Sequence, residues 1–530
     1  MRYKFFFIFL LFFTFAFSQE KSQESPRLVV GIKIDGLQAS HLHKMWKYLT
    51  PGGFRKILSE SMVVERMQHN IVSAGNAADA ATYMTGTYPY YHGVSGDFYF
   101  SRADNEAISI LYDKNQTGIG TKNKFSAHRL LTSTFTDELM LNNSLSQVHS
   151  IAIRAEDAIM MGGHTATSVS WIDDITNRWI TTAYYPKGLS RWADLMNVNG
   201  TFKELISEKW TPSASISTYL NQTVKGSKTV PFSYNPTDRR EGNSARTILA
   251  NTPAANSLVT ELAKTIVEKE LLGADPHTDV LMLQYTVKIQ NQIASSLHYA
   301  EQEDMYIRLD RNIQSLLYEL SSKIGADKLY VFVVGSGSDV HSPELLGKNQ
   351  IPAGHFNADK SLALLNTYLM AIYGQEKWIT GYYGKNIFLN KRKIEDKNLN
   401  LTDFTKRITE FLVEFEGVQA AYTSADILQF SGENSDARMK IRNSTNKNTS
   451  GDIMIELMPG WIEVDNKGNV VGDANNPVVN VPFYLMGKGI KPHQVTEIYS
   501  TTDIAPTISS LMDIPFPNAC TGRQIIPIEQ

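Results

Sequence analysis

Cysteine is almost absent from this sequence of 530 residues, in which Cys520 is the single example. One thiol cannot form an internal disulfide, and it cannot supply a cluster of cysteine ligands to a metal ion. A disulfide-stabilised module and a cysteine-based zinc site are therefore excluded. We expect Cys520 to behave as a small hydrophobic side chain.

An excess of charge of one sign is lacking too. The chain has 51 Lys and Arg residues against 54 Asp and Glu residues, which gives a formal net charge of -3 at pH 7. Nucleic acids and anionic membranes are bound by clustered Lys and Arg side chains, so we expect neither as a partner. Hydrophobic residues make up 42% of the chain, which is enough for a globular protein with a large core.

Long hydrophobic runs are limited to Phe5–Phe17, which is shorter than the ~20 residues that a membrane-spanning helix needs. The run follows Arg2 and Lys4, the pattern of a cleavable secretory signal. We expect a signal peptide over 1–18 and a polar linker over 19–26, and an uncleaved anchor is the less favoured alternative. No cysteine follows the run for lipid attachment, so we expect an exported protein, periplasmic or associated with the outer membrane.

Shorter apolar runs predict buried strands. The first ends in Asp35-Gly36, as expected of a strand whose carboxyl end opens into a site. Further strand-like runs are 149–155, 278–287, 328–337 and 480–489, and apolar residues recur at helical spacing over 303–325. Alternating strands and helices predict an α/β fold with a mostly parallel central sheet covered on both faces. We expect one domain over 27–530, with an inserted cap at about 171–244.

Several motifs carry a family resemblance. They are "LVVGIKIDGL", "MTGTYPYYHGVSG", "IAIRAEDAIMMGGHTATSVSWID", "IPAGHFNADK", "SGDIMIELMPGW" and "TTDIAPTISSLMDIPFPNACTGRQI". Together they resemble the alkaline phosphatase superfamily, close to its type I phosphodiesterase/nucleotide pyrophosphatase branch, in order from about Arg27 to Ile526. The resemblance implies a three-layer α/β/α sandwich with two zinc ions and a Thr or Ser nucleophile. Two cations roughly 4 Å apart would stabilise the attacking and leaving oxygens of an in-line phosphoryl transfer.

The positions that the resemblance assigns to this centre have mostly changed. Asp35 matches the first zinc ligand and is retained, whereas Asn76 stands at the nucleophile, where a carboxamide cannot attack phosphorus. The remaining ligand positions carry Ile289, Ile293, Ser336, Gly337 and Asn480. An isoleucine or a glycine has no side-chain lone pair to offer zinc.

The positions that would contact the phosphate differ as well. Asp97 matches a family Asn, and Arg154 and Glu156 match a family Lys-x-Arg pair. Two carboxylates in place of neutral or cationic donors would repel a phosphoester, by about 1 to 4 kcal/mol for each close pair.

These changes predict an inactive protein with no metal cofactor, acting as a structural or partner-binding component of a cell-envelope complex. In this interpretation Asn76 is a helix N-cap, Asp35 accepts hydrogen bonds from local backbone amides, and Ile289 and Ile293 fill the core on one helical face.

Two alternatives stay open. The cleft could bind a small polar ligand without cleaving it. Alternatively, the protein could be a phosphoester hydrolase with a rearranged metal site around Asp35, Asp339 and His341. His92, His164 and His355 are interpreted as hydrogen-bonded scaffold residues.

Overall fold

The computed structural model describes residues 25–72, 75–173, 175–219, 224–225, 228–229, 231–235, 249, 252–289, 299–337, 343–433, 436–468, 470–472 and 479–525. The predicted signal peptide and most of the predicted linker lie outside these residues, as do Ile293, Asp339 and His341.

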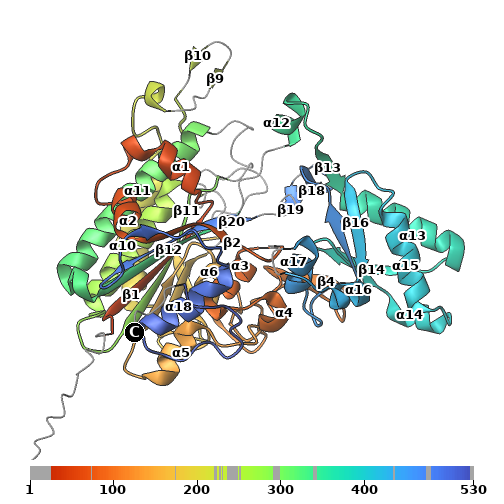
Figure 1. Ribbon diagram of the computed structural model, residues 1–530, viewed down its shortest axis with the longest axis horizontal. Coiled ribbons are helices and arrows are strands. Elements are labelled where there is room, and N and C mark those ends of the chain that lie inside the picture. The colour runs from red at the N-terminus through yellow and green to blue at the C-terminus, as the bar shows by residue number, and fades with distance from the viewer. Residues whose placement is uncertain are drawn as a thin grey trace, which may run out of the picture.

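A ten-stranded mixed sheet forms the centre of the larger lobe (Figure 1). Its strand order is β21 (His493–Gln494), β2 (Met62–Gln68), β20 (Asn480–Gly487), β12 (Leu329–Ser336), β1 (Leu28–Asp35), β11 (Asp279–Thr286), β6 (Val148–Ile151), β7 (Ser168–Ile172), β8 (Trp179–Thr182) and β5 (Gly118–Ile119). The five strands from β12 to β7 run parallel to their neighbours, whereas β20 is antiparallel to β12. Each predicted strand is present, so the α/β class with a mostly parallel sheet is confirmed.

Side chains of β1 alternate between two helical layers. Val30 and Ile32 belong to the core on the side of α10 (Pro253–Lys269) and α11 (Tyr299–Ile324), and α11 matches the predicted helix 303–325 to within one residue at its end. Val29 packs on the opposite side, with helices α3 (Asn76–Thr85), α5 (Phe135–Asn142), α6 (Ala155–Gly162) and α18 (Ile504–Leu511). Lys33 and Asp35 have the parity of Val29 and therefore face the layer of α3 and α6.

A smaller lobe lies at the side of the sheet lobe and has a core of its own, with Leu365, Trp378 and Phe404 at its centre (Figure 1). Its strands are β13 (Gly354–Asn357), β14 (Ile379–Tyr383), β15 (Asn386–Leu389), β16 (Val418–Thr423), β17 (Ile453–Leu457), β18 (Trp461–Val464) and β19 (Val470–Gly472). Its helices are α12 (Pro343–Lys348), α13 (Ala358–Tyr373), α14 (Lys391–Asp396), α15 (Leu401–Leu412), α16 (Ser424–Gln429) and α17 (Ala437–Ser444).

The hairpin of β3 (Phe98–Ser101) and β4 (Glu106–Ser109) joins the two lobes. The Phe100 ring stacks on Phe388 of β15 with ring centroids 4.4 Å apart. Arg102 forms two hydrogen bonds with the buried Asp452 carboxylate, at 2.9 and 3.0 Å. These contacts fix the smaller lobe next to Asp97, which precedes β3.

The predicted cap segment, about 171–244, is described in part. It includes β8, α7 (Arg191–Val198), α8 (Thr201–Ser207), the 3-10 turn Ile216–Thr218, β9 (Val224–Lys225) and β10 (Lys228–Thr229). Helices α7 and α8 both contact α10 of the sheet lobe. The domain and cap boundaries stay predictions.

The remaining elements are short. They are α1 (Ala39–Lys44), α2 (Phe54–Glu60), α4 (Pro89–His92) and the 3-10 turns Trp46–Tyr48, Ala326–Lys328 and Thr501–Asp503. Within the described ranges, no helix combines the length and the apolar character that crossing a lipid bilayer requires.

Candidate active site

Three neighbouring strands end side by side and bring polar side chains to one edge of the sheet. β1 pairs with both β11 and β12, and the register places Asp35 opposite Thr286 and Ser336. Ligands of open α/β sheets bind at the edge where parallel strands end. This edge, which the position of Asp35 predicted, is the candidate active site.

Asp35 is buried among side-chain donors. Its Oδ1 accepts a hydrogen bond from Ser336 Oγ at 2.6 Å and lies 2.5 Å from Lys33 Nζ, and its Oδ2 accepts one from Gln284 Nε2 at 3.0 Å. The predicted contacts with local backbone amides are wrong, because side chains of three adjacent strands converge on the carboxylate. Burial by itself would raise the pKa of Asp35, but the charges of Lys33 and Arg154 outweigh it and hold this pKa below its usual value.

Lys33 is a buried lysine in the middle of the sheet, and the sequence analysis missed it. Its Nζ lies 2.7 Å from Asp157 Oδ1 of α6 as well as against Asp35, and the side chains of Lys33 and Asp157 are 1% and 0% exposed. Burial favours the neutral amine, but the Asp157 and Asp35 carboxylates outweigh this and raise the pKa of Lys33. A lysine inside an otherwise apolar strand was the available signal, since a buried charge needs a partner.

The N-terminus of α3 is capped by Asp97 rather than by Asn76. The N-cap residue is Gly75, which makes no side-chain cap, and Asn76 is the first helical residue. Asp97 Oδ1 accepts a hydrogen bond from the Ala77 amide at 2.8 Å. The predicted capping role of Asn76 is therefore wrong, because a carboxylate from a later loop satisfies the helix end.

Asp97 and Glu156 place two carboxylates close together. Burial raises the pKa of Asp97 to about 7, and the charge of Glu156 acts in the same direction. The amides of Ala77 and Asn76 and the charge of Arg154 oppose this shift. Asp97 can therefore take up or release a proton near neutral pH.

Arg154 precedes α6 and stands among carboxylates. Burial disfavours its charge, but Asp35, Glu156, Asp157 and Asp97 outweigh burial and raise the pKa of Arg154. Within the described part of the chain, its guanidinium makes no hydrogen bond or ion pair. A guanidinium offers a planar set of donors that suits carboxylate and phosphate oxygens.

The other predicted positions lie around the same edge or on the nearby core. Ser336 ends β12 and Gly337 follows it. Asn480 begins β20, which is antiparallel to β12, so it also lies at this edge. Ile289 follows β11 outside any helix and is partly buried against the core beside α10 and α11, while its proposed helical partner Ile293 is not among the described residues.

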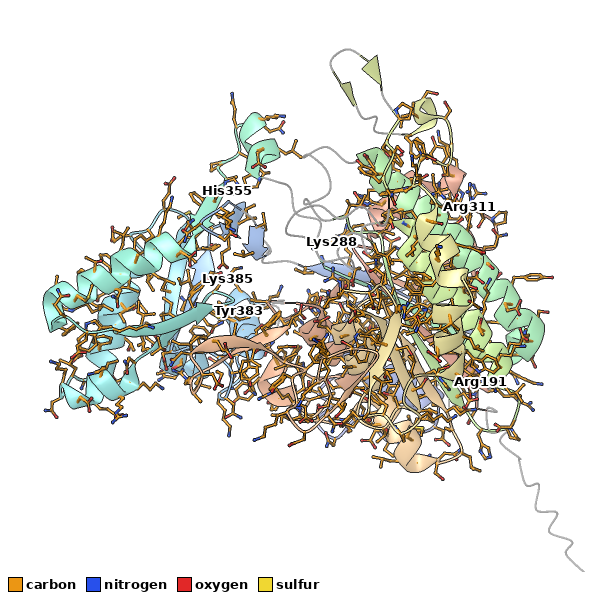
Figure 2. All side chains as sticks on the ribbon, turned by 180° about the vertical axis from the view of Figure 1, so that it is seen from behind. Arg191, Lys288, Arg311, His355, Tyr383 and Lys385 are labelled. Carbon is orange, nitrogen blue, oxygen red and sulfur yellow. The ribbon has the colours of Figure 1, made fainter. Side chains whose placement is uncertain are left out.

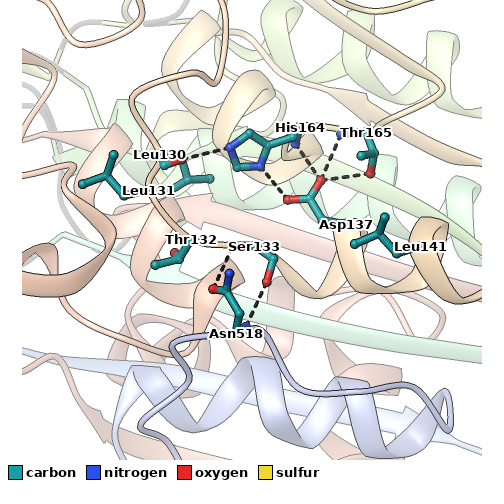
Figure 3. Close-up of a pocket in the computed structure, with 9 residues that line it drawn as sticks. All are labelled: Leu130, Leu131, Thr132, Ser133, Asp137, Leu141, His164, Thr165 and Asn518. Carbon is teal, nitrogen blue, oxygen red and sulfur yellow. Dashed lines mark hydrogen bonds and ion pairs between the residues drawn. The ribbon is translucent and has the colours of Figure 1, made fainter.

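Two of the three predicted scaffold histidines are embedded in hydrogen bonds. His92 is buried, contacts Thr82 Oγ1 at 3.2 Å, and has its pKa lowered to about 3 by burial. His164 contacts Asp137 Oδ2 at 2.8 Å through Nδ1, and both side chains line a small pocket (Figure 3). Asp137 also accepts hydrogen bonds from the amide and the hydroxyl of Thr165. The charged groups of this pocket, Asp137 and His164, are therefore engaged in hydrogen bonds that stabilise the fold. His355, half exposed, lies 3.4 Å from Glu344.

The smaller lobe contributes Tyr383 to the surroundings of Asp97. Figure 2 shows Tyr383 and Lys385 on the side of that lobe that faces the sheet lobe, where Lys288 is labelled. The Tyr383 ring lies 5.9 Å from the Phe98 ring. Burial raises the pKa of Tyr383, with Asp97 as the first of the contributing carboxylates.

The described residues do not fit a two-zinc centre. Within the described ranges, no group of three or more His, Cys, Asp or Glu side chains could hold a metal ion. Asp35 is surrounded by the donors Lys33, Ser336 and Gln284, whereas zinc needs neighbours that present lone pairs. Asp339 and His341, the predicted alternative ligands, lie outside the described residues.

The chain is similar over almost its whole length to named phosphatases. It is 26% identical to the alkaline phosphatase PafA of Elizabethkingia meningoseptica, over 95% of this chain and 94% of the relative. It is 27% identical to the alkaline phosphatase PhoV of Synechococcus elongatus, over 94% and 92%. A Myroides odoratus protein named calcium-transporting ATPase is 29% identical, over 97% and 96%.

The crystal structure of PafA superimposes with a TM-score of 0.84 at 25% identity, covering 94% of this chain and 98% of that one. These full-length similarities overturn the expectation of an inactive, partner-binding protein and support a hydrolase. The expectation rested on matched positions taken singly. The structure adds that Arg154 stands among the carboxylates of Asp35, Asp97, Glu156 and Asp157, a cluster that the matched positions alone do not show.

The expectation of no metal cofactor is overturned by the same relationship, because the resemblance implies zinc for this family. The described residues alone do not complete a zinc centre. The family model for type I phosphodiesterase/nucleotide pyrophosphatase matches residues 29–480. This match spans most of the chain, which therefore belongs to the type I phosphodiesterase/nucleotide pyrophosphatase family.

Proposed function

We propose that this protein is a phosphoester hydrolase whose site differs from that of its alkaline phosphatase relatives. The observation that carries the proposal is the Arg154 guanidinium at the carboxyl edge of the sheet, which makes no hydrogen bond or ion pair with described residues. A phosphate group is the anion that such a guanidinium binds well, through paired N–H···O bonds.

Asp97 is the proposed proton acceptor. Asn76 cannot act as a nucleophile, so a water molecule attacks phosphorus as the bond to the leaving alcohol oxygen breaks. The water gives a proton to a base, and the leaving oxygen takes up a proton. A carboxyl group with a pKa of about 7 suits this exchange at neutral pH.

The test is a comparison of wild-type protein with Arg154→Met. Both are purified without chelator and assayed on phosphomonoester and phosphodiester substrates, with and without added zinc, and their metal content is measured. We expect kcat/KM to fall about 10- to 100-fold in the variant, because one charge-assisted interaction is lost.

Arg311→Met is the matched control. Arg311, labelled in Figure 2, is exposed on α11, which covers the face of the sheet opposite α3 and α6, and its removal should leave kcat/KM unchanged. Absence of turnover by the wild type under every condition would contradict the proposed function. Equal kcat/KM of wild type and Arg154→Met would show that Arg154 has no part in the proposed function.

We further propose that the protein acts outside the cytoplasm, which the signal-like pattern of its first 18 residues favours. A partner in a cell-envelope complex stays an untested prediction.

A further inference from the structure

The positive charge against Asp35 belongs to the protein itself. We propose that Lys33 is a tethered cation that takes the place of a divalent metal ion at Asp35, so that this carboxylate is an internal counter-ion instead of a metal ligand. The inference concerns this one carboxylate, and it does not depend on the hydrolysis proposed above.

Both oxygens of the Asp35 carboxylate already have partners. Lys33 Nζ lies 2.5 Å from Oδ1, and Ser336 Oγ donates to the same oxygen at 2.6 Å. Gln284 Nε2 donates to Oδ2 at 3.0 Å. A zinc ion would need an oxygen at about 2.0–2.2 Å, so it would have to displace one of these donors.

The neighbours of Asp35 also have the wrong polarity for a metal centre. A metal centre is built from side chains that present lone pairs, whereas Lys33 and Ser336 present hydrogens to Asp35. Gln284 is held in the same sense, because its Oε1 accepts a hydrogen bond from the Ile153 amide at 3.0 Å, which turns its NH2 group toward Asp35. The site thus stabilises Asp35 as an ionised carboxylate that accepts hydrogen bonds and coordinates no metal ion.

Lys33 is also buried and held in place by its contacts. It lies on β1, between β11 and β12, and its side chain is 1% exposed. Asp157 Oδ1 lies 2.7 Å from Nζ, and within the described residues Asp157 Oδ2 has no hydrogen-bond partner. Removing Lys33 would take away the ammonium group that both buried carboxylates contact, which is strongly unfavourable.

Lys33 and Ser336 both act on the Asp35 carboxylate, and their positions on the strands account for this. Residues two apart on a strand share a face, so a lysine here reaches the Asp35 carboxylate directly. The position matched to a zinc ligand at the end of β12 carries Ser336, which donates to Asp35. A hydroxyl there suits a carboxylate paired with an ammonium group, where a second carboxylate would compete for it.

The first experiment is zinc titration by calorimetry on wild-type protein and Asp35→Asn. We expect wild type and Asp35→Asn to show the same zinc affinity, including the case in which neither binds zinc. Asp35→Asn should unfold at a lower temperature because Lys33 has lost its counter-ion. A fall in zinc affinity of about 10-fold or more in Asp35→Asn alone would overturn the inference. Asp113→Asn is the control, because it removes a carboxylate whose hydrogen bonds come from Asn115 and Ser126 and not from Lys33.

The second experiment uses unaltered protein, in case Asp35→Asn does not fold. Lysines are reductively methylated with and without saturating zinc and then quantified by peptide mass spectrometry. Lys33 should stay unmodified in both samples while the more exposed Lys56 reacts. Zinc-dependent methylation of Lys33 would mean that zinc displaces it from Asp35, and the inference would fall.

Discussion

At the scale of single residues, the protonation of Asp97 depends on burial and on one neighbouring carboxylate. Burial and Glu156 raise its pKa to about 7, against the amides of Ala77 and Asn76 and the charge of Arg154. Tyr383 is the titratable group that the smaller lobe adds nearby. A raised carboxyl pKa contributes stability that is fully present below the unfolded-state pKa and is lost as pH rises through about 7.

Asp97→Asn should therefore remove the part of the pH dependence of stability that Asp97 causes. We expect the unfolding temperature of the variant, relative to wild type, to rise between pH 4 and pH 7, with a free-energy change on the order of a few kcal/mol. Thermal unfolding monitored by circular dichroism over that range measures it. Glu156→Gln should lower the pKa of Asp97, so the loss of stability with rising pH should begin at a lower pH than in wild type. Parallel curves of unfolding temperature against pH for wild type and Asp97→Asn would contradict the assignment.

At the scale of the elements, the start of α3 depends on the backbone of Gly75. Its φ is +148°, and a Cβ atom there would collide with the Asp97 carboxylate that caps the helix. Gly200, with φ of +89° and no atom within 4 Å of a built Cβ, offers a comparison in open space.

Gly75→Ala should destabilise the protein more than Gly200→Ala. We expect roughly 1 kcal/mol for Gly200→Ala from backbone strain alone, and about 2–4 kcal/mol for Gly75→Ala, where loss of the Asp97 cap is added. Urea unfolding of the two variants measures the difference. Similar losses in both would show that the Asp97 contact contributes little.

At the scale of the whole molecule, the β3–β4 hairpin couples the smaller lobe to the candidate site. Phe100 stacks on Phe388 and lies three residues after Asp97, while Phe404 is buried in the core of the smaller lobe, away from this junction. Phe100 is 5% exposed and Phe404 is 1% exposed, so truncating either one removes a buried ring.

Phe100→Ala and Phe404→Ala should both cost about 3–5 kcal/mol of stability. Only Phe100→Ala should also lower kcat/KM for the phosphoester, because it loosens the segment that holds Asp97. Unfolding and steady-state kinetics at a temperature where both variants are folded give the two quantities. An equal loss of activity in both would mean that the effect is global instability.

The fold class could be predicted from the sequence because buried parallel strands are continuous apolar runs, and those ending at Asp35, Thr286 and Ser336 met at one edge as expected. The inactive interpretation was wrong because it followed matched positions alone. The pairing of Lys33 could not be predicted either, because its partners come from two separate elements, β1 and α6. The capping of α3 was missed since its acceptor, Asp97, is 20 residues further along the chain than Ala77.

The sequence by itself determined the strand positions, the polar edge at Asp35 and the family resemblance, because each depends on residues close together in the chain. Only the tertiary structure decided which charges face each other: Lys33 between Asp35 and Asp157, Asp97 on the end of α3, and Arg154 among carboxylates. These pairings join strands, helices and loops that are distant in sequence. Burial then makes them strong, since water no longer screens the charges.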